Sequence, residues 1–275
     1  MQRLLKSLSW QRANWRATLE LYRRAAWPQA RRIRQLSRRP IVIGGCGRSG
    51  TTLLLSILSC HPRLFAIDIE TTALCRDGYG ADGLYNRTPD LDAPFELGRI
   101  YGYLREHEIP ASCTRWCEKT PRNVIYFGRI LQHFGKGVRL IHLVRDGRDV
   151  VTSVHPNDPT RYWVTPHRWV MDVAAGRRWE DHPQVLTVRY EELVRDYEAT
   201  LRRLCRFIEE DFTAAFLQYP ETARVKESIA WFNPAQKMND RSIGRWREEK
   251  HAAALAAFER EPGALELLRY YGYLA

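Results

Sequence analysis

No continuous apolar run in the sequence is long enough to span a bilayer, and the N-terminal segment does not have the pattern of a signal peptide. The six cysteines include no CxxC pair. Cys113 and Cys117 lack the second His or Cys pair that a zinc site needs. We therefore expect no metal, a cytoplasmic protein and reduced thiols. A disulfide stays open in case the protein is exported.

Acidic residues are almost absent from residues 1–39, which hold eleven Lys or Arg against the single acid Glu20. The resulting charge of +10 is nearly all of the chain's +11. Leucines and tryptophans mixed with arginines indicate a basic amphipathic helix with a break at Pro28. Such a helix would bind a membrane surface or an acidic partner, or would pack on its own domain. We expect residues 1–39 to be this extension and residues 40–275 to form one domain, with no specific nucleic-acid ligand.

From residue 40 onward, short apolar runs alternate with helical patterns. Strands are predicted at 40–45, 64–69, 115–118, 138–144 and 185–188, and helices at 51–59, 147–154, 166–180 and 191–210. A helix also begins near Pro121, two short helices close the chain, and residues 76–95 and 220–245 are predicted to be irregular. The alternation predicts a three-layer α/β domain whose central parallel sheet is flanked by helices.

The glycine-rich turn after the first strand lacks one lysine. It reads Gly45-Cys-Gly-Arg-Ser-Gly50-Thr51-Thr52, which keeps the frame G-x-x-x-x-G-K-[ST] with Thr51 in the lysine position. Such a turn points backbone N–H groups and a helix dipole at an anion. The missing lysine normally contacts the β- and γ-phosphates of a nucleoside triphosphate. Its loss disfavours an ATPase or a kinase, and Arg48 is the cation that the loop offers instead.

Two motifs resemble those of the sulfotransferases that use 3′-phosphoadenosine-5′-phosphosulfate (PAPS). Gly47-Arg48-Ser49-Gly50-Thr51-Thr52-Leu53 is similar to the family's 5′-phosphosulfate loop. Arg145 at a strand end, with Ser153 eight positions later, is similar to the family's 3′-phosphate site, where a guanidinium can fork onto phosphate oxygens. The resemblance implies a P-loop-like fold, PAPS as co-substrate, 3′-phosphoadenosine-5′-phosphate (PAP) as product and a hydroxyl-bearing acceptor.

Later segments extend the resemblance. Tyr190, in Arg189-Tyr190-Glu191-Glu192-Leu193, is similar to a family tyrosine near the adenine, although it also fits a core tyrosine that begins a helix. Ser242-Ile-Gly-Arg245-Trp246 is similar to the segment that closes over the nucleotide, which makes Arg245 the candidate cation for the 3′-phosphate. Ser242 is the candidate serine of this nucleotide-binding segment, and Ser228 competes for the same role.

Sulfuryl transfer to a hydroxyl needs a base for the acceptor proton and cations for the charge on the leaving oxygen. Glu70 resembles the glutamate base of protein-tyrosine sulfotransferases, and Asp68 or a histidine, His155 first, stay open as alternatives. Lys119 resembles the Lys-x-Pro segment of the tyrosine and carbohydrate enzymes, which implies contact with the sulfonate or the leaving oxygen. Arg48 is the third catalytic candidate.

Two other functions remain to be separated from this one. A P-loop kinase with an unusual loop would need an acid that holds Mg²⁺ at the end of an apolar strand, and Asp146 could be misread as that acid. A module bound to a membrane or nucleic acid would use the loop only to sense a nucleotide. It would keep the function of its basic segment after the loss of Glu70 and Lys119, and it would need no acceptor. Glu118, next to Lys119, is expected to face a cation or solvent. Tyrosine, carbohydrate and other alcohols all remain possible acceptors.

Overall fold

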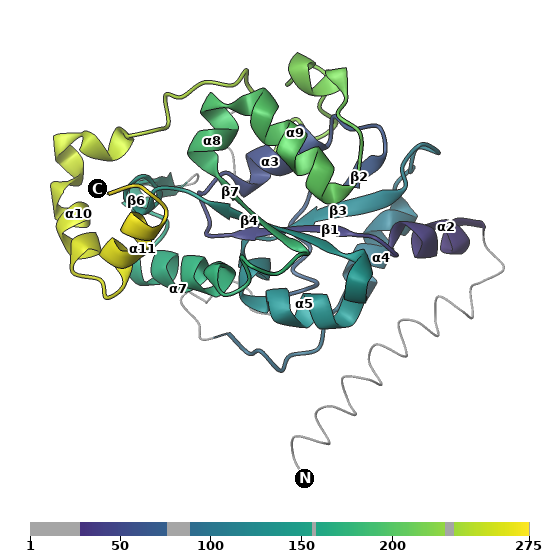
Figure 1. The fold of residues 1–275 in the computed structure, drawn as a ribbon, viewed down its shortest axis with the longest axis horizontal. Coiled ribbons are helices and arrows are strands. Elements are labelled where there is room, and N and C mark those ends of the chain that lie inside the picture. The colour runs from purple at the N-terminus through teal and green to yellow at the C-terminus, as the bar shows by residue number, and fades with distance from the viewer. Residues whose placement is uncertain (1–27, 76–88, 156–157, 229–233, 275) are drawn as a thin grey trace, which may run out of the picture.

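The computed structural model describes residues 28–75, 89–155, 158–228 and 234–274, around a five-stranded parallel sheet (Figure 1). The strand order is β2 (Leu64–Ala66), β3 (Arg115–Lys119), β1 (Ile41–Gly45), β4 (Arg139–Val144) and β7 (Val185–Arg189). Ile41 pairs with Cys117 on one side and with Arg139 on the other. Because all neighbouring pairs are parallel, all five strands end at the same edge. The predicted α/β architecture is confirmed.

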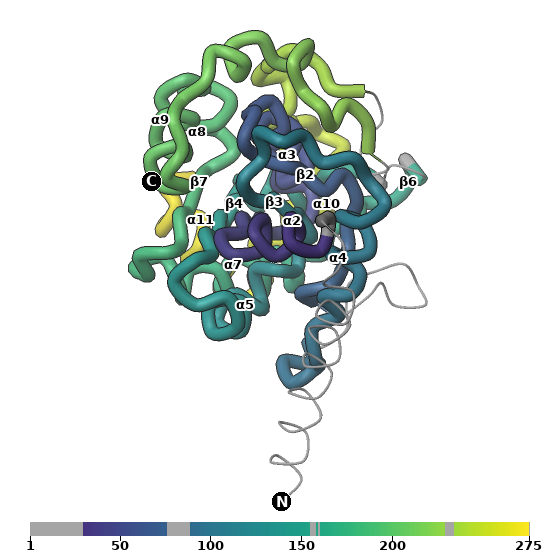
Figure 2. The backbone as a smooth tube through the Cα atoms, turned by 90° about the vertical axis from the view of Figure 1, so that its right-hand side faces the viewer, coloured from purple at the N-terminus to yellow at the C-terminus, as the bar shows by residue number. Residues whose placement is uncertain are grey.

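Helices cover both faces of this sheet. In the two views α3 lies on one side of the strands and α5 on the other (Figure 1 and Figure 2). The first side carries α3 (Thr51–Leu58), α8 (Tyr190–Arg195) and α9 (Tyr197–Ile208), and the second carries α2 (Pro28–Leu36), α4 (Leu97–Glu106), α5 (Phe127–Phe134) and α7 (Pro166–Arg177). Successive strand side chains alternate between the two cores: Ile41 and Ile43 contact the α3 side, and Val42 the α5 side.

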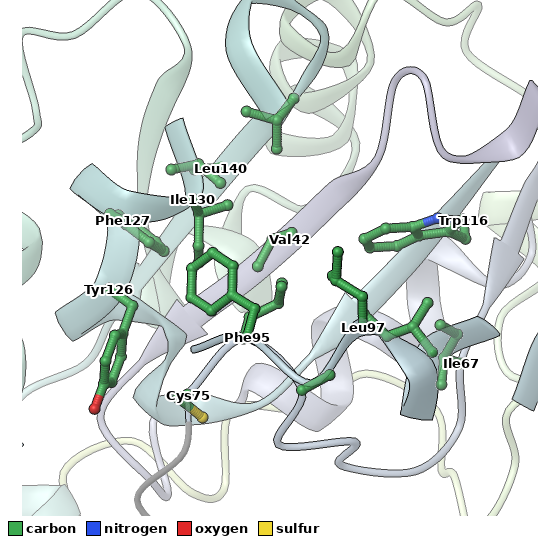
Figure 3. Close-up of a cluster of buried hydrophobic side chains, with 14 of the residues drawn as sticks. Val42, Ile67, Cys75, Phe95, Leu97, Trp116, Tyr126, Phe127, Ile130 and Leu140 are labelled. Carbon is green, nitrogen blue, oxygen red and sulfur yellow. The ribbon is translucent and has the colours of Figure 1, made fainter. Parts of the chain in front are cut away.

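The core on the α5 side includes part of the predicted N-terminal extension. Figure 3 shows Trp116, Val42 and Leu140 on the strands, with Phe127 and Ile130 of the helical layer beside them. Ile33 and Leu36 of α2 are buried in the same cluster. Residues 28–36 therefore pack on the domain, whereas the rest of the basic segment, residues 1–27, lies outside the described residues.

The remaining elements build the carboxyl edge of the sheet and the C-terminal part. They are α6 (Gly147–Val151), the hairpin of β5 (Val154–His155) and β6 (Asp158–Tyr162), α10 (Ala252–Glu259) and α11 (Ala264–Tyr270). Short 3₁₀ helices occur at η1 (Pro121–Tyr126), η2 (Gly135–Gly137), η3 (Ala214–Gln218), η4 (Arg245–Arg247) and η5 (Glu249–His251). Trp169 of α7 and Phe258 of α10 join a third core, which fixes the C-terminal helices to the sheet.

Several element boundaries differ from the predicted ones. The helix predicted at 191–210 is two helices, because Asp196 leaves helical geometry between α8 and α9. The helix near Pro121 begins as the 3₁₀ turn η1, and α4 and the β5–β6 hairpin were not predicted. All six cysteines lie in the described part of the chain, buried and without a disulfide. Among the described helices none has the length and apolar character needed to cross a membrane.

Candidate active site

Each strand of the sheet leads into a predicted site residue at the carboxyl edge. Lys119 ends β3, Arg145 follows β4, Tyr190 follows β7, and Glu70 comes four residues after the end of β2. The loop after β1 is the glycine-rich turn. Ligands of parallel α/β sheets bind at this edge. A cavity of about 350 Å³ lies there, and its lining includes Gly47, Arg48, Gly50, Thr51, Thr52, Glu70, Arg145, Tyr190 and Ser242.

The glycine-rich loop has the geometry of an anion cradle. Gly50 has φ 92°, in the left-handed region that glycine adopts without steric cost, and α3 begins at the next residue. A Cβ on Gly50 would lie 2.5 Å from the ring of Tyr190, so the ring packs directly on the loop. The hydroxyl of Ser49 is fully buried and has no hydrogen-bond partner in the described structure. Leaving such a hydroxyl unpaired costs about 1–3 kcal/mol, which an anionic oxygen at the loop would relieve.

Arg48 connects this loop to the residues that follow α6. Its Nε donates to Oγ of Ser153 at 2.9 Å, and its guanidinium lies 5.4 Å from the ring centre of Trp163. Burial, together with the nearby charges of Arg145 and Arg245, lowers the pKa of Arg48 to about 10. Crowded, buried cations of this kind favour a bound anion.

Arg145 joins three segments at the other end of the cavity. It donates to the carbonyl of Arg48 at 3.0 Å and to the carbonyl of Ser242, and its guanidinium lies 4.6 Å from the ring centre of Tyr190. The hydroxyls of Tyr190 and Ser242 are 2.6 Å apart. Nε of Arg145 is buried without a partner in the described structure. Arg145, Tyr190 and Ser242 therefore form one cluster that lines the cavity beside the glycine-rich loop.

Glu70 and Lys119 form an ion pair, with 2.5 Å between Oε1 and Nζ. Glu70 lines the cavity, whereas Lys119 is almost fully buried behind it. Asp68 does not line the cavity; its carboxylate is exposed and accepts a hydrogen bond from the hydroxyl of Tyr103 at 2.6 Å. His142 is a core residue whose pKa burial lowers to about 3, and the side chain of His155 lies outside the described residues.

Other predicted residues lie differently from expectation. Arg245 is exposed in η4 and, like Ser228, is not part of the cavity lining, although its charge acts on Arg48. Asp146 caps α6 and forms an ion pair with Arg148 at 2.7 Å, so its carboxylate is already engaged. Among the described residues, no three or more His, Cys, Asp or Glu are arranged to hold a metal ion.

The expectation for Glu118 was wrong. Its side chain is fully buried and its carboxylate accepts hydrogen bonds from neutral groups. The reason is strand alternation: Glu118 and Lys119 point to opposite faces of β3, and the face of Glu118 is covered by the turn after β3 and by the segment that follows β2.

The cavity also contains residues that sequence reasoning missed. Arg168 of α7 is almost fully buried and forms an ion pair with Asp172 at 3.2 Å, and Lys237 comes from the segment 234–244. Neither residue stands in a motif, so only the tertiary structure identifies them. Together with Arg48 and Arg145 they set four cations against the one carboxylate of Glu70 in the described lining. This donor set fits a ligand with several phosphate-like groups.

Comparisons with known proteins agree with this chemistry. A family model described as "Sulfotransferase family" matches residues 40–214. Protein-tyrosine sulfotransferase 1 of Danio rerio is 26% identical over 205 residues, which cover 66% of this chain and 56% of that protein. An uncharacterized protein of Aquifex aeolicus (strain VF5) is 24% identical over 239 residues, which cover 77% of this chain and 31% of that protein. The chain therefore spans about half of the length of the Danio rerio protein and about a third of the length of the Aquifex aeolicus protein.

Solved structures share the fold. The sulfotransferase domain from the curacin biosynthetic pathway superimposes with a TM-score of 0.54 at 18% identity, over 86% of this chain and 98% of that one. A mouse sulfotransferase complexed with PAP superimposes with a TM-score of 0.50 at 17% identity, over 86% and 90% of the two chains.

Proposed function

Because the chain belongs to the sulfotransferase family, we propose that it transfers a sulfuryl group from PAPS to an acceptor hydroxyl and releases PAP. The observation that carries the proposal is the Glu70–Lys119 ion pair in the wall of the cavity that the phosphate loop also lines. Bound PAPS would supply the sulfuryl group and the phosphate that leaves. A base, two cations and a phosphate cradle are the parts that this reaction needs.

The nucleotide would be held by two groups of residues. The backbone N–H groups of residues 47–52, with Arg48, would bind the 5′-phosphosulfate at the start of α3. Arg145 and Ser153 would bind the 3′-phosphate, assisted by Ser242 and Arg245, and the ring of Tyr190 would lie near the adenine. The contacts among Arg48, Arg145, Tyr190 and Ser242 support this division, since they join the loop to the strand end after β4.

In the reaction itself Glu70 would receive the acceptor's proton as the acceptor oxygen attacks. Lys119 holds the Glu70 carboxylate at the cavity wall, and with Arg48 it would offset the negative charge on the leaving oxygen. Glu70 is preferred to Asp68 as the base because only Glu70 of the two lines the cavity.

We propose a tyrosine, a carbohydrate or a related alcohol as the acceptor. The segments around Glu70 and Lys119 resemble those of tyrosine and carbohydrate sulfotransferases, and one of the curated relatives is protein-tyrosine sulfotransferase 1. Ile69, next to Glu70, is half exposed, so an apolar part of the acceptor could pack beside the base. The kinase alternative loses support because Asp146 is engaged by Arg148 and the loop lacks the lysine.

The decisive test is a titration of PAP against wild type and Arg145→Ala, with ADP and ATP as controls. We expect wild type to prefer PAP, and the preference to fall about 10–100-fold in the variant, the cost of losing one charged hydrogen-bonding partner. Arg177→Ala, a surface arginine change on α7, should leave binding unchanged. Equal affinity for ATP and PAP, with no effect of Arg145→Ala, would refute the proposal.

A further inference from the structure

Glu118 is a fully buried carboxylate without a role in the reaction described above. It lies on β3 directly before Lys119, on the face of the strand that points away from the cavity. Its Oε1 accepts hydrogen bonds from the backbone N–H of Thr71 at 3.3 Å, from the hydroxyl of Thr71 at 2.9 Å and from the hydroxyl of Thr120 at 2.6 Å. Its Oε2 accepts one from Nδ2 of Asn123 at 2.7 Å.

Each of these partners is arranged to donate. The hydroxyl of Thr71 accepts from the N–H of Ala73 at 3.2 Å, and the hydroxyl of Thr120 accepts from the N–H of Thr72 at 3.3 Å. Both hydroxyl hydrogens are thereby left to point at Glu118. With the backbone N–H of Thr71 and the amide of Asn123, four donors surround the carboxylate. Burial raises the pKa of Glu118, and the hydrogen bonds from Thr120, Asn123 and Thr71 act in the opposite direction.

These bonds join the two segments that carry the proposed catalytic groups. Thr71 follows Glu70 directly, and Thr120 follows Lys119 directly. Nδ2 of Asn123 also donates to the carbonyl of Ile43 at 3.3 Å, and Ile43 lies two residues before Gly45, where the glycine-rich loop begins. Glu118 is thus joined directly to the segment after β2 and to the end of β3, and through Asn123 to β1.

The backbone next to Glu70 is strained in a way that needs such support. Thr72 has φ 50°, a conformation that costs a β-branched residue about 1–3 kcal/mol. Its N–H is held by Thr120, and its hydroxyl accepts from Arg99 at 2.6 Å. Strain of this size persists only where the surrounding contacts fix the backbone.

We propose that Glu118 is a positioning residue that holds Glu70 against Lys119 by fixing residues 71–72 to the end of β3. It acts through the backbone of the Glu70 segment and touches no reacting atom. The expected effect on kcat rests on the proposed role of Glu70 as the base. The expected effect on the backbone at residues 71–72 rests on the hydrogen bonds alone.

The kinetic test compares Glu118→Gln with wild type, using PAPS and an acceptor that wild type sulfates. We expect kcat to fall about 10–100-fold, the usual cost of a small misplacement of a catalytic group, while the Kd for PAP stays unchanged. In a Glu70→Gln background the same substitution should reduce kcat less than about 2-fold, because the group that it positions is already lost. An equal loss in both backgrounds would overturn the inference.

The structural test needs no acceptor. Hydrogen exchange of the backbone amides of Thr71 and Thr72 should become at least about 10-fold faster in Glu118→Gln. The Thr71 amide loses its carboxylate acceptor, and Thr120, which accepts from the Thr72 amide, loses the carboxylate to which its own hydroxyl donates. Unchanged exchange at both amides would overturn the inference. If Glu70→Gln itself retains full activity, the proposed base is wrong, and the exchange result still decides whether Glu118 holds this segment.

Two further variants serve as a control and as a second test of the inference. Glu210→Gln removes another nearly buried carboxylate, paired with Arg63 at 2.6 Å and remote from the cavity lining, and should alter neither kcat nor the two amides. Thr71→Val keeps Glu118 and removes only one of its donors. It should lower kcat in the same direction by a smaller factor, so the inference remains testable even if Glu118→Gln does not fold.

Discussion

At the scale of single residues, the two acids that follow β2 differ in whether they line the cavity: Glu70 does and Asp68 does not. Asp68 and Glu70 are two positions apart and cannot be told apart by sequence pattern alone. The structure separates them by their partners, Tyr103 for Asp68 and Lys119 for Glu70.

Replacing Glu70 by Gln should lower kcat for sulfuryl transfer about 100-fold or more, because general base catalysis contributes about 10²–10⁴-fold. The Kd for PAP should stay within about 2-fold of wild type, since the nucleotide contacts are elsewhere. Steady-state kinetics with isothermal titration would measure both. Asp68→Asn is the matched control, and a larger loss in that variant would reassign the base.

His142 predicts a pH dependence of stability. Burial lowers its pKa to about 3 in the folded protein, below the usual value near 6.5, so the unfolded chain binds a proton that the folded protein excludes. The free energy of unfolding should therefore decrease as the pH falls below about 6.5, by up to about 1.4 kcal/mol per pH unit from this group. Urea denaturation at pH 7 and pH 5.5 would show a shallower dependence in His142→Leu. Equal dependence in both proteins would contradict the assignment.

At the scale of elements, the phosphate loop depends on one glycine that lies under an aromatic ring. Gly50→Ala would place a Cβ 2.5 Å from the ring of Tyr190 in a left-handed conformation. We expect a loss of stability of about 1–2 kcal/mol and at least a 10-fold weaker affinity for PAP. Thermal unfolding and PAP titration would measure the two effects.

Gly102 in α4 is the control for that change. A Cβ there meets nothing within 4 Å, so Gly102→Ala should stabilise the helix by about 0.5–1 kcal/mol and leave PAP affinity unaltered. A Gly50→Ala protein that binds PAP like wild type would show that the loop can move away from Tyr190.

The sequence predicted those features that are encoded locally. Strands such as 138–144 are continuous apolar runs, and the glycine turn, the Arg145–Ser153 spacing and Lys119-Thr-Pro are contiguous motifs. Arg168 and Lys237 were missed, and the surroundings of Glu118 were predicted wrongly, because all three depend on what packs against them from distant segments. The break at Asp196 was missed because helical periodicity continues across it.

At the scale of the whole molecule, the positive charge of the described cavity should govern nucleotide affinity. Arg48, Arg145, Arg168 and Lys237 line the cavity together, so Kd for PAP should rise steeply as NaCl increases from about 50 to 300 mM. Calorimetric titration at several salt concentrations would measure the slope. A Kd independent of salt would indicate that these cations are not used for binding.

Binding should also stabilise the fold as a whole. At a PAP concentration about 100 times its Kd, the free energy of unfolding should increase by about 2.7 kcal/mol, which raises Tm by about 5 °C or more. Differential scanning fluorimetry with PAP, ADP and ATP would test this. A larger shift with ATP than with PAP would contradict the proposed nucleotide preference.

The convergence of five strand ends on one cavity has a consequence for the order of events in folding. Glu70, Lys119, Arg145, Tyr190 and Ser242 come from segments spread over more than half of the chain, and no segment shorter than residues 70–242 contains them all. Pairings between distant segments form late because closing large loops is entropically costly. During refolding, recovery of catalysis should therefore lag behind recovery of the helical circular dichroism signal. Activity would then measure the formation of the last long-range contacts.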